Sequence, residues 1–133
     1  MIKFRKSTVV IVVALVALYA IGKMLPRFID SRVPSLRAST KAFSVSAVQN
    51  GVYEGRAFLL PVSVRVRATV SDGRIASIEL LKHFNGQGKP AEAIVGDVIA
   101  DQSLGVDVIA GATYSSLTIL KAIENALSKG IER

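Results

Sequence analysis

Apolar and polar side chains alternate strictly over residues 62–70, VSVRVRATV. Side chains of a strand point alternately to its two faces, so this pattern predicts a strand with one buried and one solvated face. An Asp-Gly pair follows within SDGR, residues 71–74, and such a pair readily adopts the positive φ angles of a tight hairpin turn. Residues 75–81, IASIELL, then predict the returning strand. The segment is therefore predicted to be a β-hairpin.

Two later segments have helical periodicity. Pro90 suits the first turn of a helix over residues 91–102, and a second helix is predicted from Leu117 onward, with Gly130 suited to end it. Residues 106–111 are predicted to be a short strand or an extended segment, and residues 83–90 a glycine-rich loop. The apolar positions that carry the helical pattern are Ile94, Val95, Val98 and Ile99 in the first helix, and Ile119, Leu120, Ile123, Ala126 and Leu127 in the second.

A long apolar segment lies near the N-terminus. Residues 7–25 supply 19 residues with only Lys23 charged, close to the roughly 20 residues that a helix needs to cross a bilayer. Two interpretations are open, an uncleaved signal anchor and a cleaved signal peptide. A cleavage site requires small residues two positions apart, and Leu18 before Ala20 does not fit, which favours the anchor.

The charges around this segment indicate its orientation. Lys3, Arg5 and Lys6 precede it and place the N-terminus in the cytoplasm by the positive-inside rule, although basic residues also follow the segment. The sequence therefore predicts a single-pass protein of the cytoplasmic membrane, with its folded domain on the extracytoplasmic side.

Together these elements predict an α+β fold, in which a small antiparallel, twisted sheet packs with helices after one N-terminal transmembrane helix. We expect a signal anchor over 1–25, a linker with little structure over 26–48, where prolines and serines gather, and one domain over 49–133. About 100 residues support one small domain rather than two.

Composition excludes several classes of function. The chain has no cysteine, which excludes disulfides and thiolate chemistry, and its one histidine, His83, makes a poor metal site without cysteine. Its net charge is +7, but residues 1–32 hold six basic and one acidic residue, against eleven and nine in residues 33–133. The excess flanks the apolar segment, where it meets anionic lipid headgroups, so a membrane rather than a nucleic acid is the expected partner.

Small and hydroxyl residues gather in GVDVIAGATYSS, residues 105–116. Ser115 or Ser116 is predicted to be the N-cap of the second helix, and Gly111 with Ala112 allows the backbone to approach another group closely. A helix N-terminus also offers free N–H groups to an anion. From these residues alone two interpretations remain open, a turn with a helix cap and the attachment point of a phosphate-bearing cofactor.

The region from about Asn50 to Lys129 resembles the FMN-binding domain family, which includes the flavinylated C-type subunit of sodium-pumping NADH:quinone reductase and the G-type subunit of the Rnf complex. The sequence motifs that carry the resemblance occur in the order and at the spacing typical of the family. They are NGVYEG at 50–55, SDGRI at 71–75, IELLKH at 78–83, DQS at 101–103 and VDVIAGATYSS at 106–116.

The resemblance implies that a flavin transferase joins FMN through a phosphoester to Thr113. Asp107, Gly111 and Ala112 match the other positions of the attachment motif, and Ala110 departs from it, because the family usually has serine or threonine there. The family also often has a histidine near the flavin at the position of His83. The remaining expected cofactor-binding residues follow the attachment threonine directly: Tyr114, Ser115 and Ser116.

The implied function is that of an extracytoplasmic electron carrier with membrane redox proteins as donor and acceptor, rather than an enzyme with catalytic residues of its own. Two alternatives remain. The domain could feed electrons to a separate reductase, or it could be a membrane-tethered sensor or assembly domain without flavin.

Overall fold

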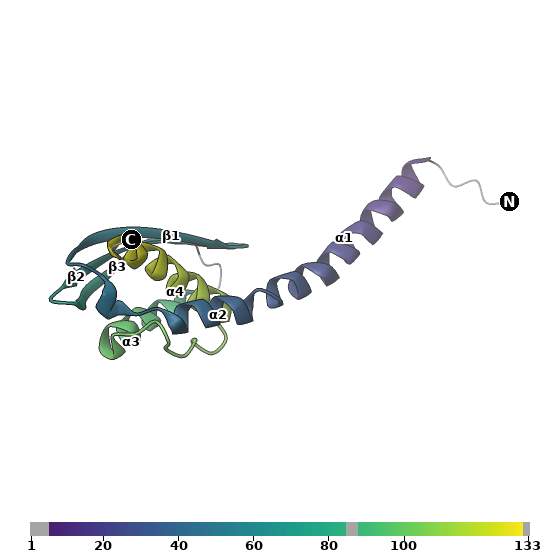
Figure 1. Ribbon diagram of the computed structural model, residues 1–133. Helices are drawn as coiled ribbons and strands as arrows, with labels where there is room; N and C mark the ends of the chain where they lie inside the picture. The colour runs from purple at the N-terminus through teal and green to yellow at the C-terminus, as the bar shows by residue number, and fades with distance from the viewer. Residues whose placement is uncertain (1–5, 85–87, 132–133) are drawn as a thin grey trace. The chain divides into compact units, whose positions relative to one another are not determined.

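The computed structural model describes residues 6–84 and 88–131 (Figure 1). The chain forms two compact units, Met1–Arg32 and Val33–Arg133. The first unit contains α1 (Lys6–Asp30), which continues through Pro26, and its apolar side chains are exposed. This helix is long and apolar enough to cross a membrane, with a mean hydropathy of 2.4 in its most apolar stretch.

The second unit is built on a three-stranded antiparallel sheet. Its strands β1 (Gly51–Leu59), β2 (Val62–Ser71) and β3 (Arg74–Phe84) lie side by side in that order. Asp72 and Gly73 turn the chain between β2 and β3 with φ angles of 53° and 69°. Both central residues of this turn therefore have positive φ, as a two-residue hairpin requires, and the predicted hairpin is confirmed. The predicted α+β class, with an antiparallel sheet and helices, is confirmed as well.

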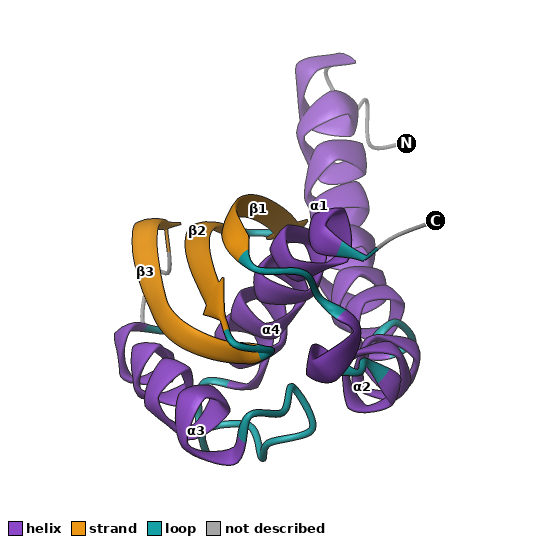
Figure 2. Cartoon of the chain, turned by 60° about the vertical axis from the view of Figure 1, so that its left-hand side comes forward, coloured by secondary structure: helices purple, strands orange, loops and turns teal. Residues whose placement is uncertain are grey.

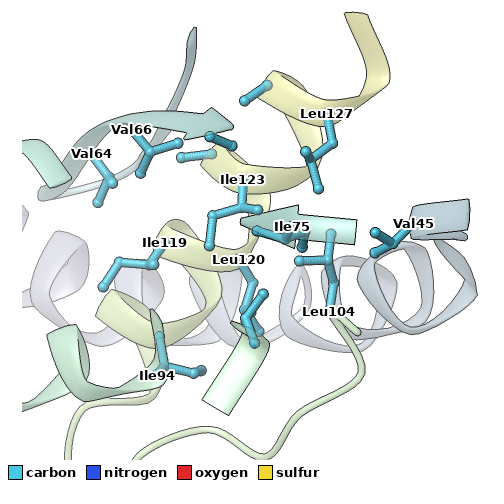
Figure 3. Close-up of a cluster of buried hydrophobic side chains, with 14 of the residues drawn as sticks. Val45, Val64, Val66, Ile75, Ile94, Leu104, Ile119, Leu120, Ile123 and Leu127 are labelled. Carbon is cyan, nitrogen blue, oxygen red and sulfur yellow. The ribbon is translucent and has the colours of Figure 1, made fainter. Parts of the chain in front are cut away.

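The alternating side chains of β2 divide the sheet into an inner and an outer face. The inward residues are almost fully buried, with Val66 and Ala68 at 0% exposure. On the inner face lies α4 (Thr113–Leu127), whose apolar side supplies much of the core, as Figures 2 and 3 show. The helix predicted from Leu117 is thus present but begins at Thr113, and a short 3-10 turn, Ser128–Gly130, follows it.

The helix predicted over 91–102 is divided into two parts. Pro90 lies in a 3-10 turn, Lys89–Ala93, and α3 (Ile94–Asp101) follows directly. Ile94 and Val98 are buried in the core as predicted. The predicted loop over 83–90 is described only in part: His83 and Phe84 belong to β3, whereas residues 85–87 lie outside the described residues.

The prediction of little structure over residues 26–48 was wrong. α1 extends to Asp30, and α2 (Val33–Ala42) and a 3-10 turn (Val45–Ala47) follow. α2 packs against α4, and its Ser39 hydroxyl donates to Glu124 of α4 over 3.1 Å. The serines and proline suggested a linker, but proline is tolerated in the first turn of a helix, and contacts with α4 stabilise this one.

Gln102 joins the end of α3 to the edge strand β3. Its side-chain oxygen accepts from the Ile75 N–H over 2.7 Å, and its nitrogen donates to the carbonyl oxygens of Ile75 and Ile99 over 3.0 and 2.7 Å. The amide thus pairs with a strand edge that has no strand neighbour in the three-stranded sheet.

We expect Gln102→Ala to lower the free energy of unfolding by about 2–3 kcal/mol, because each lost hydrogen bond contributes about 1 kcal/mol. Urea unfolding measures the change. Gln49→Ala, at an exposed position, is the control and should change stability by less than about 0.5 kcal/mol. Equal stability of both variants would show that the Gln102 amide does not hold α3 to the sheet.

Candidate functional site: the loop before helix α4

The segment before α4 is an irregular loop that ends in a turn. Residues 106–111 were predicted to be either a short strand or an extended segment. They do not form a strand. The Ala112 N–H donates to the Ile109 carbonyl over 3.0 Å and closes a turn through Ala110 and Gly111. Gly111 has a φ of 78°, which glycine adopts without strain. A Cβ atom there would meet nothing within 4 Å, so the backbone conformation, not space, requires glycine.

The predicted N-cap at Ser115 or Ser116 was wrong. The N-cap of α4 is Ala112, and both serines lie in the first turn with exposures of 3% and 0%. The Ser116 hydroxyl oxygen instead accepts from the Ile109 N–H over 3.0 Å, which ties the loop to the helix. The prediction failed because a serine before an apolar run is typical of a cap, whereas this bond is made to a residue seven positions earlier.

The N-cap residue of α4, Ala112, therefore makes no side-chain hydrogen bond to the first turn of the helix. The first N–H groups of a helix have no partner within the helix, and together with the helix dipole they favour an anion. At this end of α4 the first helical residue is Thr113, which is half-buried. Within residues 6–84 and 88–131, no hydrogen bond holds the Thr113 hydroxyl.

The other predicted site residues of this segment differ in their surroundings. Asp107 is exposed on the loop, whereas Tyr114 is half-buried and packs against the core. A hollow of about 240 Å³ lies beside Asp107 and is lined in part by Arg37 and Lys41 of α2. Sequence reasoning missed these two cations because it treated α2 as linker. The helical spacing of Val33, Leu36 and Thr40 was the signal available in the sequence.

His83 lies within β3, and its side chain is only 3% exposed. Its Nδ1 atom is 3.0 Å from Glu92 Oε1, in the 3-10 turn before α3. This turn also packs against α4. Lys89 contacts the other carboxylate oxygen of Glu92 over 2.9 Å. Hydrogen bonds from Lys89 and then from His83 hold the pKa of Glu92 below its ordinary value of 4.5.

The Glu92 contacts predict a pH-dependent contribution to stability. Because the pKa of Glu92 is lower in the folded chain, its ionised form stabilises the fold above pH 4.5, and this contribution is lost as the pH falls through the lowered pKa. We expect Glu92→Gln to cost about 1 kcal/mol near neutral pH. The difference from the unchanged chain should shrink in acid, as measured by urea unfolding at both pH values. A difference that stays constant would contradict this role.

The second unit is thus a small α+β domain in which the hydroxyl of Thr113, the first residue of α4, makes no hydrogen bond among the described residues. The sequence profile of the FMN-binding domain matches residues 62–128, about half of the chain. The chain belongs to the FMN-binding domain family and is a flavin-binding protein.

A curated relative is similar over a larger part of the chain. It is an uncharacterized protein of Treponema pallidum (strain Nichols), 30% identical over 96 residues, which are 70% of this chain and 27% of the relative. The chain thus spans about a quarter of the length of that relative.

Proposed function

We propose that this chain is a membrane-anchored flavoprotein that carries FMN on Thr113 and passes electrons between membrane redox proteins. The single observation that carries the attachment site is the Thr113 hydroxyl, free of hydrogen bonds among the described residues and set at the N-terminus of α4. FMN, when bound, supplies reversible electron transfer through its isoalloxazine ring.

The residues around Thr113 fit the phosphate of FMN. The dipole of α4 at its N-terminus suits an anion, and the Gly111 turn leaves open space beside the loop among the described residues. A phosphate monoester carries nearly two negative charges near neutral pH, whereas its diester with Thr113 carries one. A helix N-terminus stabilises a bound anion by only about 0.3–1 kcal/mol. A covalent bond to Thr113 therefore retains FMN better than the helix end alone.

Attachment requires a partner, for which a flavin transferase is the proposed enzyme. The Thr113 oxygen forms a bond to the phosphorus of a flavin donor with an anhydride phosphate. In the same exchange, the anhydride bond breaks, its leaving group departs and the hydroxyl proton is lost. Asp107 is exposed and lies six residues before Thr113 in the sequence, and it is the proposed contact for the transferase.

The proposed anchor is α1, whose exposed apolar surface suits the interior of a bilayer. Lys3 and Arg5 before α1, with Lys6 as its first residue, support a cytoplasmic N-terminus and an extracytoplasmic domain. Such a location also favours a covalent cofactor, because lost FMN is not replaced outside the cell.

The test is co-expression of the full chain with a flavin transferase, followed by alkaline extraction of the membranes and a denaturing gel. We expect the chain to stay with the membrane and to give a band with flavin fluorescence. Protease added from the extracytoplasmic side should digest its folded domain. Dithionite should bleach the flavin and an added acceptor should restore it. A chain that holds no flavin after denaturation would contradict covalent attachment, and one that alkali extracts would contradict the anchor.

A further inference from the structure

The outer face of the sheet carries its side chains in rows that cross the three strands. α4 packs on the inner face (Figure 2), so the outward side chains of β1, β2 and β3 are not part of the core. The strand register places directly opposed residues in three successive rows. These rows are Phe58, Ser63 and Phe84; Arg56, Arg65 and Lys82; and Glu54, Arg67 and Glu79.

The third row carries charges of both signs, one arginine between two glutamates. Arg67 lies 2.8 Å from Glu54 and 3.2 Å from Glu79. Hydrogen bonding from Arg67, followed by the charge of the nearby Arg65, holds the pKa of Glu54 below its ordinary value. Opposite charges in neighbouring strands stabilise a sheet, so this row has an evident structural role.

The second row is purely basic, and like charges directly opposite each other destabilise a sheet. Arg65 reaches Glu54 diagonally over 3.1 Å. Arg56 and Lys82 make no ion pair with any residue that the structure describes. The fold therefore gains nothing evident from these two cations, whereas an anionic partner would be attracted by them.

Apolar side chains lie next to this basic row, at the end of the sheet where β1 turns into β2. Phe58 is 67% exposed, Phe84 62% and Leu60, in the turn, 48%. An open hollow of about 640 Å³ beside them is lined by Arg56, Lys82 and Phe58, among others. Exposed aromatic and aliphatic side chains backed by cations are typical of surfaces that enter the headgroup region of a bilayer.

We propose that this basic-aromatic face, defined as Arg56, Phe58, Leu60, Arg65, Lys82 and Phe84, docks on anionic lipid. The cations donate to lipid phosphates, and the three apolar side chains enter the interface. The proposal rests on the proposed anchor, because a span in α1 would tether the chain that follows it, from Val33 onward, to the membrane. Docking would hold the domain in one orientation to the bilayer.

The experiment uses the full chain, whose lack of cysteine allows a single label. An environment-sensitive fluorophore is attached to one of two single-cysteine variants. The first is Leu60→Cys, and the second is Ser77→Cys, an exposed position at the far end of the same face. The chain is reconstituted in vesicles of phosphatidylcholine with or without phosphatidylglycerol, and brominated lipid serves as the quencher. We expect blue-shifted, quenched emission at position 60 only, and only with phosphatidylglycerol present.

A double variant tests the role of the cations. Arg56→Gln with Lys82→Gln removes two charges that make no ion pair among the described residues, so the fold should be unaffected. Each cation near an anionic surface contributes a factor of about five in binding, so docking should weaken by roughly 25-fold. Arg74→Gln, an exposed position near Ser77, is the matched control and should leave docking unchanged.

The proposal is overturned if position 60 stays in water in both lipids, if positions 60 and 77 respond alike, or if the double variant docks as well as the unchanged chain. A label that responds to an acidic soluble protein and not to vesicles would assign the face to a protein partner instead. Alkaline extraction of the same vesicles tests the anchor and is interpreted separately from docking. Extraction of the chain contradicts the anchor, whereas a retained chain with its label in water contradicts docking.

Discussion

Replacing Thr113 with alanine is expected to abolish covalent flavin, leaving a dark band of undiminished amount on a denaturing gel. The substitution removes the only atom of this side chain that can form the phosphoester. It should cost little stability, because Thr113 is half-buried and its hydroxyl makes no hydrogen bond with any residue that the structure describes. In-gel flavin fluorescence, normalised to protein, measures the loss.

Two variants serve as controls for this result. Thr113→Ser keeps a hydroxyl at the start of α4 and should retain a fluorescent band. Thr69→Ala removes the hydroxyl of another half-buried threonine, which lies on the outer face of the sheet and not in α4. This variant should carry as much covalent flavin as the unchanged chain. A Thr113→Ala band as bright as that of the unchanged chain would place the flavin on another residue.

Gly55→Ala is expected to destabilise the domain by about 3 kcal/mol or more. Gly55 lies in β1 where the backbone of α4 crosses the sheet, and a Cβ atom there would lie 2.8 Å from the Ala126 Cα atom and still closer to the Ala122 carbonyl oxygen and the Ala126 nitrogen. These are backbone atoms, which cannot move aside as a flexible side chain does, so α4 must shift away from the sheet. Urea or thermal unfolding measures the change.

Gly96→Ala is the matched control, since it adds the same methyl group to a glycine of α3. A Cβ atom at Gly96 meets nothing within 4 Å. Alanine in a helix is more stable than glycine by roughly 0.5–1 kcal/mol, so this variant should be slightly more stable than the unchanged chain. Similar stability of the two variants would show that α4 does not depend on close contact at Gly55.

The β2–β3 hairpin was predictable because its signals are local. Alternation identified β2, and the Asp72-Gly73 pair identified the turn that follows. α2 was missed because its stability is not local: Thr40 is its buried residue, and Ser39 bonds to Glu124, 85 positions away in the sequence. Contacts of this kind leave only a weak periodic pattern in a short, polar segment.

The sequence singled out the residues of the candidate site, but it did not predict the geometry of their loop. The run from Asp107 to Ser116 was identified, and Gly111 has the positive φ that its place in the turn requires. The roles of the two serines were not predictable, because the bond of Ser116 to the Ile109 N–H depends on how the loop folds back. The nearby cations of α2, Arg37 and Lys41, were missed because residues 26–48 were predicted to be a linker.

The mass of the peptide that contains Thr113 is the most direct test of the account. The chain is purified after co-expression with a flavin transferase, digested, and fragmented in a mass spectrometer. The account predicts that this peptide gains the mass of one FMN less one water, with the added mass on the threonine. An unmodified Thr113 peptide from flavin-containing protein, or the added mass on another residue, would contradict it.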